Sequence, residues 1–216
     1  MKYTYILFDL DGTLTDPEEG ITTSVQYALK AFGIDEPDRK KLTPFIGPPL
    51  KDSFMNFYGF SEEQAEEGIA KYREWFAPKG IFQNAVYPGI PQMLQELKES
   101  GKVLAVASSK PQVFVEKILE HFAIKDYFSV IVGSELDGTR GRKEEVVEEA
   151  LRQLGETEKA QTVMVGDRSF DILGGKQYGL VTVGVSFGYA KEGELEEAGA
   201  DYVVDTVEEL RGLLLQ

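Results

Sequence analysis

The sequence contains no cysteine, which excludes disulfide bonds and thiolate metal ligands. It contains one histidine, His121, which we interpret as a structural residue near a helix end. Acid–base or phosphoryl-transfer chemistry on histidine is therefore not expected. No apolar run approaches the roughly 20 residues that a membrane-spanning helix needs, so we expect no membrane partner. The residues up to Asp9 become acidic too soon for a signal peptide, and we expect a cytoplasmic protein.

Positive charge is also scarce, because 23 lysine and arginine residues face 37 aspartate and glutamate residues, a net charge of −14. Such an excess repels polyanions over the surface as a whole, and we expect no nucleic-acid partner. A small phosphorylated metabolite stays compatible with this charge, because a local cation can dominate inside a cleft. The sequence leaves monomer and homodimer open.

Short runs rich in valine and isoleucine recur along the 216 residues, and segments with helical periodicity separate them. Runs that are apolar on both faces indicate a parallel sheet covered by helices on each side. We therefore predict an α/β fold with a Rossmann-like, doubly wound parallel sheet. The predicted strands are residues 5–9, 103–107, 130–133, 163–166, 181–185 and 202–204. The predicted helices are residues 91–100, 111–122, 144–154, 170–178 and 207–214.

Residues 16–85 interrupt this alternation. They contain three segments with helical periodicity, at 21–32, 50–58 and 62–76, and loops rich in proline and glycine. Trp75 and Phe76 are expected in a small core of their own. We predict a helical cap domain of residues 16–85, inserted into a catalytic core of residues 1–15 and 86–216.

The first polar grouping at a strand end is Asp9-Leu10-Asp11-Gly12-Thr13. Residues i and i+2 of an extended chain project to the same side, so Asp9 and Asp11 can face one ligand. Gly12 permits a tight turn or a close backbone approach. A calcium loop or an ordinary Asp-Gly turn would give the same string, and these alternatives stay open for the motif alone.

Two further groupings carry hydroxyl and ammonium groups. Ser108 and Ser109 follow the strand at 103–107 and open a helix, where a hydroxyl and free N–H groups suit a phosphate oxygen. A plain N-cap is the alternative for Ser109. Lys143 stands near the start of a later helix, and a surface position is its alternative.

The fourth grouping is Gly166-Asp167-Arg168-Ser169-Phe170-Asp171. Asp167 closes a buried strand and Asp171 lies one helical turn later, so both can face the same cleft. A carboxylate beside a buried strand end is costly without a partner, which favours a nearby cation. Helix capping by Asp167 is the alternative. Arg168 is expected to pair with a carboxylate or to reach the substrate.

With these motifs in this order, the chain resembles the haloacid dehalogenase-like hydrolase superfamily over essentially its whole length. Asp9 to Thr13 match the first motif, Ser108 the second, Lys143 the third, and Gly166-Asp167 with Asp171 the fourth. The inserted cap is similar to that of the phosphoglycolate phosphatase-like branch. The strings around Gly47 and at residues 133–138 look closest to a 5′-nucleotidase-like group.

The resemblance implies a Mg²⁺-dependent phosphatase acting through an aspartyl-phosphate. Asp9 would be the nucleophile and Asp11 the proton donor and acceptor. Ser108 and Lys143 would bind the phosphoryl oxygens. The implied metal ligands are Asp9, Asp11 through its carbonyl, Asp167 and Asp171. The implied substrate contacts are Gly12, Thr13, Gly47, Ser109 and Arg168.

Three other functions are alternatives to this one. A haloalkanoate dehalogenase would have no use for Asp11 or for the Asp167 and Asp171 pair. A β-phosphoglucomutase-like phosphomutase would keep every catalytic residue and differ in the cap. A binding protein on an inactive scaffold would be expected to have lost a motif residue, and none is missing. Nucleoside monophosphate, phosphoglycolate and sugar phosphate all stay open as substrates.

Overall fold

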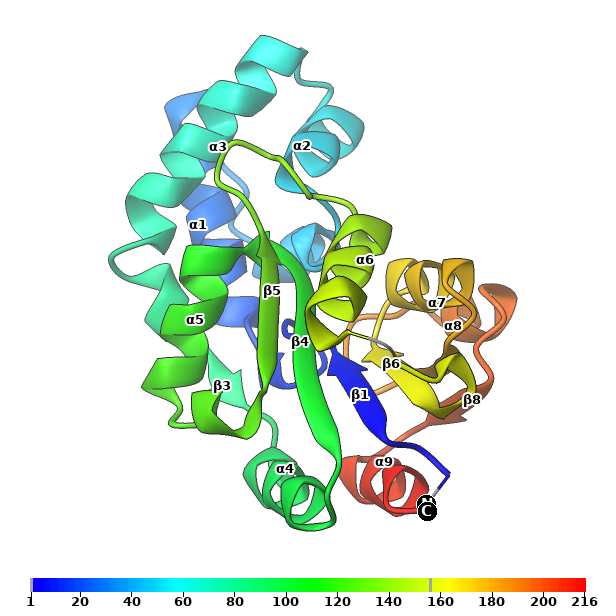
Figure 1. The fold of residues 1–216 in the computed structure, drawn as a ribbon. Helices are drawn as coiled ribbons and strands as arrows, with labels where there is room; N and C mark the ends of the chain where they lie inside the picture. Colours follow the sequence, from blue (N-terminus) through cyan, green and yellow to red (C-terminus); the bar gives the residue numbers. More distant parts are fainter. Residues whose placement is uncertain (1, 156) are drawn as a thin grey trace. The chain divides into compact units, whose positions relative to one another are not determined.

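A six-stranded sheet, parallel at every pairing, carries the predicted strand-end residues (Figure 1). The computed structural model describes residues 2–155 and 157–216. The strands are ordered β5-β4-β1-β6-β7-β8. Their bounds are β1 Tyr5–Phe8, β4 Val103–Pro111, β5 Val130–Ser134, β6 Thr162–Gly166, β7 Val181–Val185 and β8 Tyr202–Val204.

Helices cover both faces of this sheet, which confirms the predicted doubly wound α/β fold. Their bounds are α4 Ile90–Glu99, α5 Gln112–His121, α6 Lys143–Leu154, α7 Ser169–Gln177, α8 Glu194–Glu197 and α9 Val207–Leu214. Short 3₁₀ turns lie at Lys125–Tyr127 and Lys159–Gln161. Among the described residues, no helix combines the length and the apolar character that crossing a membrane requires.

The core forms because the strands are apolar on both faces. On one face Leu7 of β1, Ala107 of β4 and Met164 of β6 pack with Val146 and Val147 of α6, and all five are buried. Small residues on β4 let α6 approach the sheet closely, which fixes the position of its first turn.

The strand order places a switch point at β1. From β1 the chain moves outward through β4 to β5, and it then returns to the other side of β1 to form β6. Adjacent connections therefore leave in opposite directions, and such a point opens a crevice at the carboxyl ends of the strands. Asp9 follows β1 directly and Asp167 follows β6 directly, so both lie at this crevice.

The chain divides into two units, Met1–Asp16 with Val86–Gln216, and Pro17–Ala85. A two-stranded sheet, β2 Thr15–Asp16 with β3 Ala85–Val86, lies where the chain passes between them. The unit Pro17–Ala85 contains α1 Glu18–Ala31, η1 Arg39–Phe45, α2 Leu50–Tyr58, α3 Glu62–Phe76 and η2 Gly80–Phe82.

Local sequence features explain the helices and the core of the unit Pro17–Ala85. Helix α3 begins with reciprocal hydrogen bonds, because the Ser61 hydroxyl accepts from the Gln64 N–H and the Gln64 side chain accepts from the Ser61 N–H. The unit has its own aromatic core, with Phe45 and Phe54 fully buried and in edge contact. Of the two residues expected in that core, Phe76 is buried and Trp75 is half-buried.

The main local difference from the sequence prediction concerns β4. The strand was expected to end at Ala107 and instead continues to Pro111, with an irregular register between these two residues. Ser109 therefore does not cap α5, and Pro111 occupies the N-cap position rather than the first turn. The strand continues because the edge strand β5 still offers hydrogen-bond partners there.

Candidate active site

Asp9 and Asp11 lie in the turn that leaves β1, and both are buried. The Asp9 N–H donates to the Val165 carbonyl (2.9 Å), which keeps Asp9 in register with β6. The chain then turns at Gly12, whose φ is +85° and whose N–H donates to the Thr15 carbonyl (2.7 Å). This backbone conformation holds two carboxylates within one short turn; that they face one ligand stays a prediction.

Asp167 and Asp171 come from the β6–α7 connection and are also buried. One Asp171 oxygen accepts from the Arg168 N–H (2.9 Å), which fixes this side chain at the start of α7. One oxygen each of Asp9, Asp167 and Asp171 lies within 4.8 Å of the others. Three carboxylates, one directly after β1, one directly after β6 and one in the first turn of α7, therefore share one buried space. The Asp11 carboxylate is not part of this group.

Lys143, the first residue of α6, reaches the same space. Its ammonium lies 2.6 Å from Asp9 Oδ1 and 2.8 Å from Asp171 Oδ1, and it donates to the Ala107 carbonyl at 2.9 Å. The surface alternative for Lys143 is excluded, because its side chain is only 5% exposed. When all three carboxylates are ionised, the one ammonium balances only one of their three negative charges.

The pKa values reflect this crowding. Burial, together with the charges of Asp171 and Asp9, raises the pKa of Asp167 well above its usual value. Burial also raises the pKa of Asp171, to about 6, although Lys143 opposes the shift. Burial alone would lower the pKa of Lys143, but the neighbouring carboxylates outweigh it and raise the pKa. The ammonium therefore stays charged, while the carboxylates favour a further cation.

Backbone encloses Asp167 closely. The Tyr189 N–H donates to Asp167 Oδ2 (2.7 Å), and the Thr13 hydroxyl contacts Oδ1 at 3.5 Å. A Cβ on Gly12 or Gly188 would overlap the Asp167 carboxylate. Gly188 and Tyr189 are not among the site residues predicted from the sequence. Their only local signal is a glycine after strand β7, which does not reveal what it approaches.

The second strand-end grouping contributes Ser108 and also Lys110, for which the sequence predicts no role. Ser108 is buried, and its hydroxyl oxygen accepts from the Lys110 N–H (3.4 Å). The Ser109 carbonyl accepts from the Ser134 hydroxyl (2.8 Å), which ties this segment to β5. The Lys110 ammonium lies 2.6 Å from Asp11 Oδ2.

Arg168 and Gly47, two predicted substrate contacts, belong to different units of the chain. Arg168 forms an ion pair with Glu194 of α8 (3.0 Å), which confirms the expected carboxylate partner. Gly47 belongs to the unit Pro17–Ala85, between η1 and α2, with φ +103°. Substrate contact by either residue stays a prediction.

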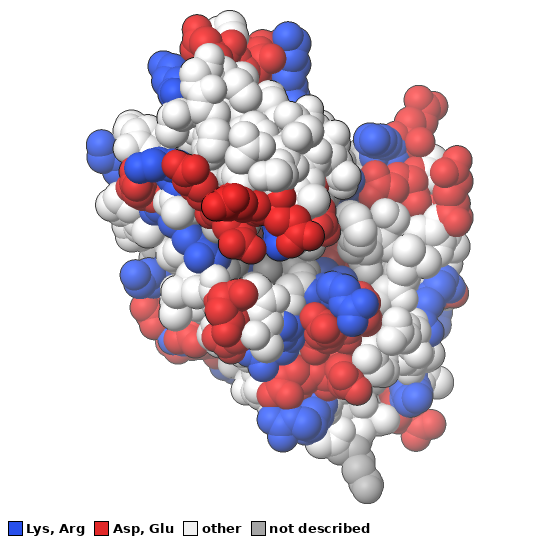
Figure 2. Space-filling model, turned by 90° about the horizontal axis from the view of Figure 1, so that it is seen from above, with Lys and Arg blue, Asp and Glu red and all other residues white. Residues whose placement is uncertain are grey.

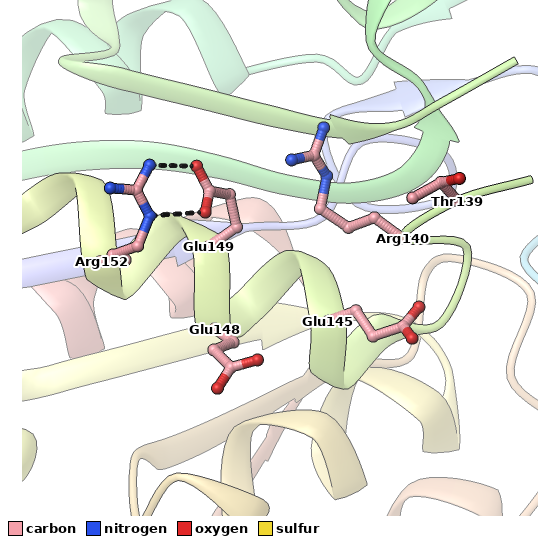
Figure 3. A pocket seen from close by; sticks show the side chains of 6 residues that line it. All are labelled: Thr139, Arg140, Glu145, Glu148, Glu149 and Arg152. Atoms are coloured by element: carbon pink, nitrogen blue, oxygen red, sulfur yellow. Dashed lines mark hydrogen bonds and ion pairs between the residues drawn. The ribbon is translucent and has the colours of Figure 1, made fainter.

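A separate hollow of about 540 Å³ lies along α6 and the loop before it (Figure 3). Arg152 and Glu149, both on α6, form two hydrogen bonds of 2.7 Å with each other on one wall of the hollow (Figure 3). None of the predicted site residues lines it. The lining residues are Thr139, Arg140, Glu145, Glu148, Glu149 and Arg152.

The carboxylate cluster fits a magnesium ion. Its donors are all oxygen atoms, the class that Mg²⁺ prefers, and two negative charges are left for a divalent cation to balance. Cysteine and histidine, which would favour a softer metal, are absent from the cluster. Asp9, Asp167 and Asp171 are the side chains that would hold the ion.

The chain is similar over most of its length to curated proteins. A curated 5′-nucleotidase from Pseudomonas aeruginosa is 50% identical over 195 residues, covering 90% of this chain and 88% of the relative. A tyrosine-protein kinase, PtkA of Mycobacterium tuberculosis, is 38% identical over 211 residues, covering 97% of this chain and 72% of the relative.

Among solved structures, a predicted phosphatase from Clostridium acetobutylicum superposes with a TM-score of 0.96 at 47% identity. The match covers 100% of this chain and 99% of that one. The haloacid dehalogenase-like hydrolase family matches residues 6–185. The resemblance drawn from the motifs is thereby confirmed: the chain belongs to the haloacid dehalogenase-like hydrolase family and is an enzyme of its phosphatase class.

Proposed function

We propose that the protein hydrolyses small phosphomonoesters in a Mg²⁺-dependent reaction, with Asp9 as the nucleophile. The observation that carries this proposal is the buried cluster of Asp9, Asp167 and Asp171 beside Lys143. A carboxylate can attack a phosphate dianion only if positive charge lies between them. Lys143 supplies part of that charge, and the cluster is suited to hold a cation that supplies the rest.

The reaction takes place in two displacements at phosphorus. In the first, the Asp9 carboxylate attacks, the ester P–O bond breaks, and Asp11 gives a proton to the departing oxygen. In the second, water attacks the aspartyl-phosphate, Asp11 takes a proton from it, and the Asp9–phosphorus bond breaks to release phosphate. A bound magnesium ion would supply charge neutralisation at the phosphoryl oxygens. Ser108 and Lys143 orient these oxygens.

The environment of Asp11 supports its role in proton transfer. Burial raises the pKa of Asp11 above its usual value, although the charge of Lys110 acts in the opposite direction. A carboxyl group with a raised pKa carries its proton more readily near neutral pH, as a general acid must.

Nucleoside 5′-monophosphates are the substrate class that we propose first. The 50% identity to a protein named a 5′-nucleotidase, over most of both chains, supports this choice. Phosphoglycolate and sugar phosphates follow, because the core residues act on the phosphoryl group and do not select the leaving group.

Phosphoryl transfer to another acceptor is the second candidate. The relative named a tyrosine-protein kinase favours it, since 38% identity over 97% of this chain includes the same core. Such a reaction would use the same Asp9 and replace water by a hydroxyl acceptor. A phosphomutase would do the same with a sugar phosphate.

A panel of phosphate esters, assayed with Mg²⁺, with chelator and with Ca²⁺, tests the proposal. We expect phosphate release that chelator abolishes, Mg²⁺ restores and Ca²⁺ does not, because calcium adopts a looser, larger coordination shell. Asp9→Asn should lower kcat by at least about 10³-fold, as loss of a nucleophile does, and leave the thermal unfolding transition in place.

Full activity in chelator, or Asp9→Asn activity within tenfold of wild type, would contradict the proposal. A parallel reaction with ATP and a tyrosine-containing peptide separates the second candidate. If the γ-phosphate of ATP is labelled, label on the peptide and not in free phosphate would favour transfer over hydrolysis.

A further inference from the structure

Lys110 is a buried lysine that the mechanism above leaves without a role. Its side chain is 7% exposed, and its ammonium lies 2.6 Å from Oδ2 of Asp11. The Asp11 side chain is 11% exposed. A buried lysine costs free energy unless a partner compensates its charge, and here that partner is the proposed proton donor. The pair therefore calls for an explanation beyond packing.

The course of β4 brings Lys110 to this place. The strand is regular to Ala107 and resumes pairing with β5 only at Pro111, so the intervening residues leave the regular register. Irregular strand segments of this kind redirect side chains and are common next to active sites. The Lys110 N–H also bonds to the Ser108 hydroxyl oxygen (3.4 Å), which ties the backbone of Lys110 to a residue predicted to bind phosphate.

The two oxygens of Asp11 differ in their surroundings. Oδ2 is paired with Lys110, whereas Oδ1 is buried and has no hydrogen-bond partner among the described residues. A buried carboxylate oxygen without a partner is uncommon, and such atoms often serve a ligand or a catalytic step. The ion pair restricts rotation about the last bond of the side chain, so that Oδ1 keeps one direction.

We propose that Lys110 is a positioning residue, which holds Asp11 by Oδ2 so that Oδ1 exchanges the proton with the leaving oxygen and then with water. The inference rests on the proposed phosphatase mechanism and adds one residue to it. In the first displacement the proton moves from Oδ1 to the departing oxygen as the ester bond breaks. In the second, Oδ1 receives a proton from the attacking water.

Positioning of Asp11 by Lys110 and direct contact of Lys110 with the phosphoryl group predict different effects on the reaction rates of two kinds of ester. Proton donation matters for a strongly basic leaving group, such as the alkoxide of a nucleoside, and matters little for p-nitrophenolate. Loss of positioning should therefore slow alkyl esters far more than aryl esters. Loss of a phosphoryl contact would slow both equally, because the transferred group is the same.

The test compares Lys110→Met with wild type on AMP and on p-nitrophenyl phosphate. We expect kcat on AMP to fall by about 10- to 100-fold, a part of the usual contribution of acid–base catalysis, and kcat on the aryl ester to fall by less than about threefold. KM should change little for either ester. Lys110→Arg, which retains the charge, should recover part of the AMP rate, and this variant also serves if Lys110→Met does not fold.

Lys102→Met is the matched control. Lys102 is also a buried lysine, it directly precedes the same strand, and its ammonium donates to the Tyr3 carbonyl (2.5 Å). Its loss should lower the unfolding temperature without changing the ratio of the AMP rate to the aryl ester rate.

A double-mutant cycle with Asp11→Asn completes the test. If Lys110 acts through Asp11, adding Lys110→Met to Asp11→Asn should cost less than about threefold further on AMP, because the acting group is already lost. Equal loss on both esters, or a double variant that loses the product of both effects, would overturn the proposal. Failure of the proposed function would instead appear as a wild-type enzyme that releases phosphate from neither ester.

Discussion

At the scale of single residues, backbone from two loops lies close against the carboxylate of Asp167. Gly12 and Gly188 both lie so close that neither has room for a Cβ, and the Tyr189 N–H bonds to one oxygen. Glycine is required at Gly12 for a second reason, since its φ is +85°. Close backbone leaves few ways for the carboxylate to move, which suits a ligand that must be in place before a metal binds.

We predict that Gly12→Ala abolishes Mg²⁺-dependent activity, because the added methyl group displaces Asp167. The free energy of unfolding should also fall by more than the roughly 1–2 kcal/mol that left-handed strain costs alone. Gly101→Ala is the control, since Gly101 has a similar φ of +78° and nothing within 4 Å of the added Cβ. It should lose only the strain energy and retain kcat. Equal kcat in the two variants would refute the assignment.

At the scale of elements, the start of α7 depends on the short helix α8. The Glu194 carboxylate accepts from the Ser169 N–H (2.9 Å), the Ser169 hydroxyl (3.0 Å) and the Arg168 guanidinium (3.0 Å). Burial alone would raise the pKa of Glu194. The hydrogen bonds from Ser169, Lys191 and Arg168 outweigh burial and lower the pKa to about 2 from an ordinary 4.5. Glu194 thereby satisfies an N–H group that the first turn of the helix leaves free.

The lowered pKa makes this contribution depend on pH. Because the folded state holds Glu194 ionised, its stabilisation is complete above about pH 4.5 and is lost as the pH falls towards 2. Glu194→Gln should lower the free energy of unfolding by about 1.5 kcal/mol near pH 7, as expected for hydrogen bonds to a charged acceptor. Urea unfolding between pH 3 and 7 measures the difference, which should shrink below about pH 4.5. A difference independent of pH would contradict this account.

At the scale of the whole molecule, the chain passes between its two units at two neighbouring strands, Thr15–Asp16 and Ala85–Val86. Asp16 accepts a hydrogen bond from the Tyr189 hydroxyl, and the N–H of the same tyrosine binds Asp167. The first crossing is thus linked to the carboxylate cluster by one residue. Both acidic and basic side chains lie on the face drawn in Figure 2.

We predict that the unit Pro17–Ala85 acts as a cap that closes when ligand binds, with hinges near residues 15–17 and 85–89. Domain closure over a bound substrate excludes water from the reaction. Small-angle scattering with Mg²⁺ and beryllium fluoride, a mimic of the phosphorylated aspartate, should show a smaller radius of gyration than the free protein. Identical scattering curves in the two states would count against closure.

The sequence by itself determined the fold class and the strand ends at which the motif residues stand. Apolar runs, helical periodicity and turn residues are local properties, so the strands that end before Asp9 and Asp167 could be predicted to within a residue. The family resemblance rested on the same local strings. The catalytic roles implied for these residues stay predictions, to be tested by the substitutions described above.

Only the tertiary structure decided which residues meet. The Lys110–Asp11 pair joins the ends of β4 and β1, and the approach of Gly188 and Tyr189 to Asp167 joins two further connections. The extension of β4 to Pro111 also depends on its neighbour β5. These features arise from contacts between segments far apart in the chain, and local sequence patterns do not show which distant segments come into contact.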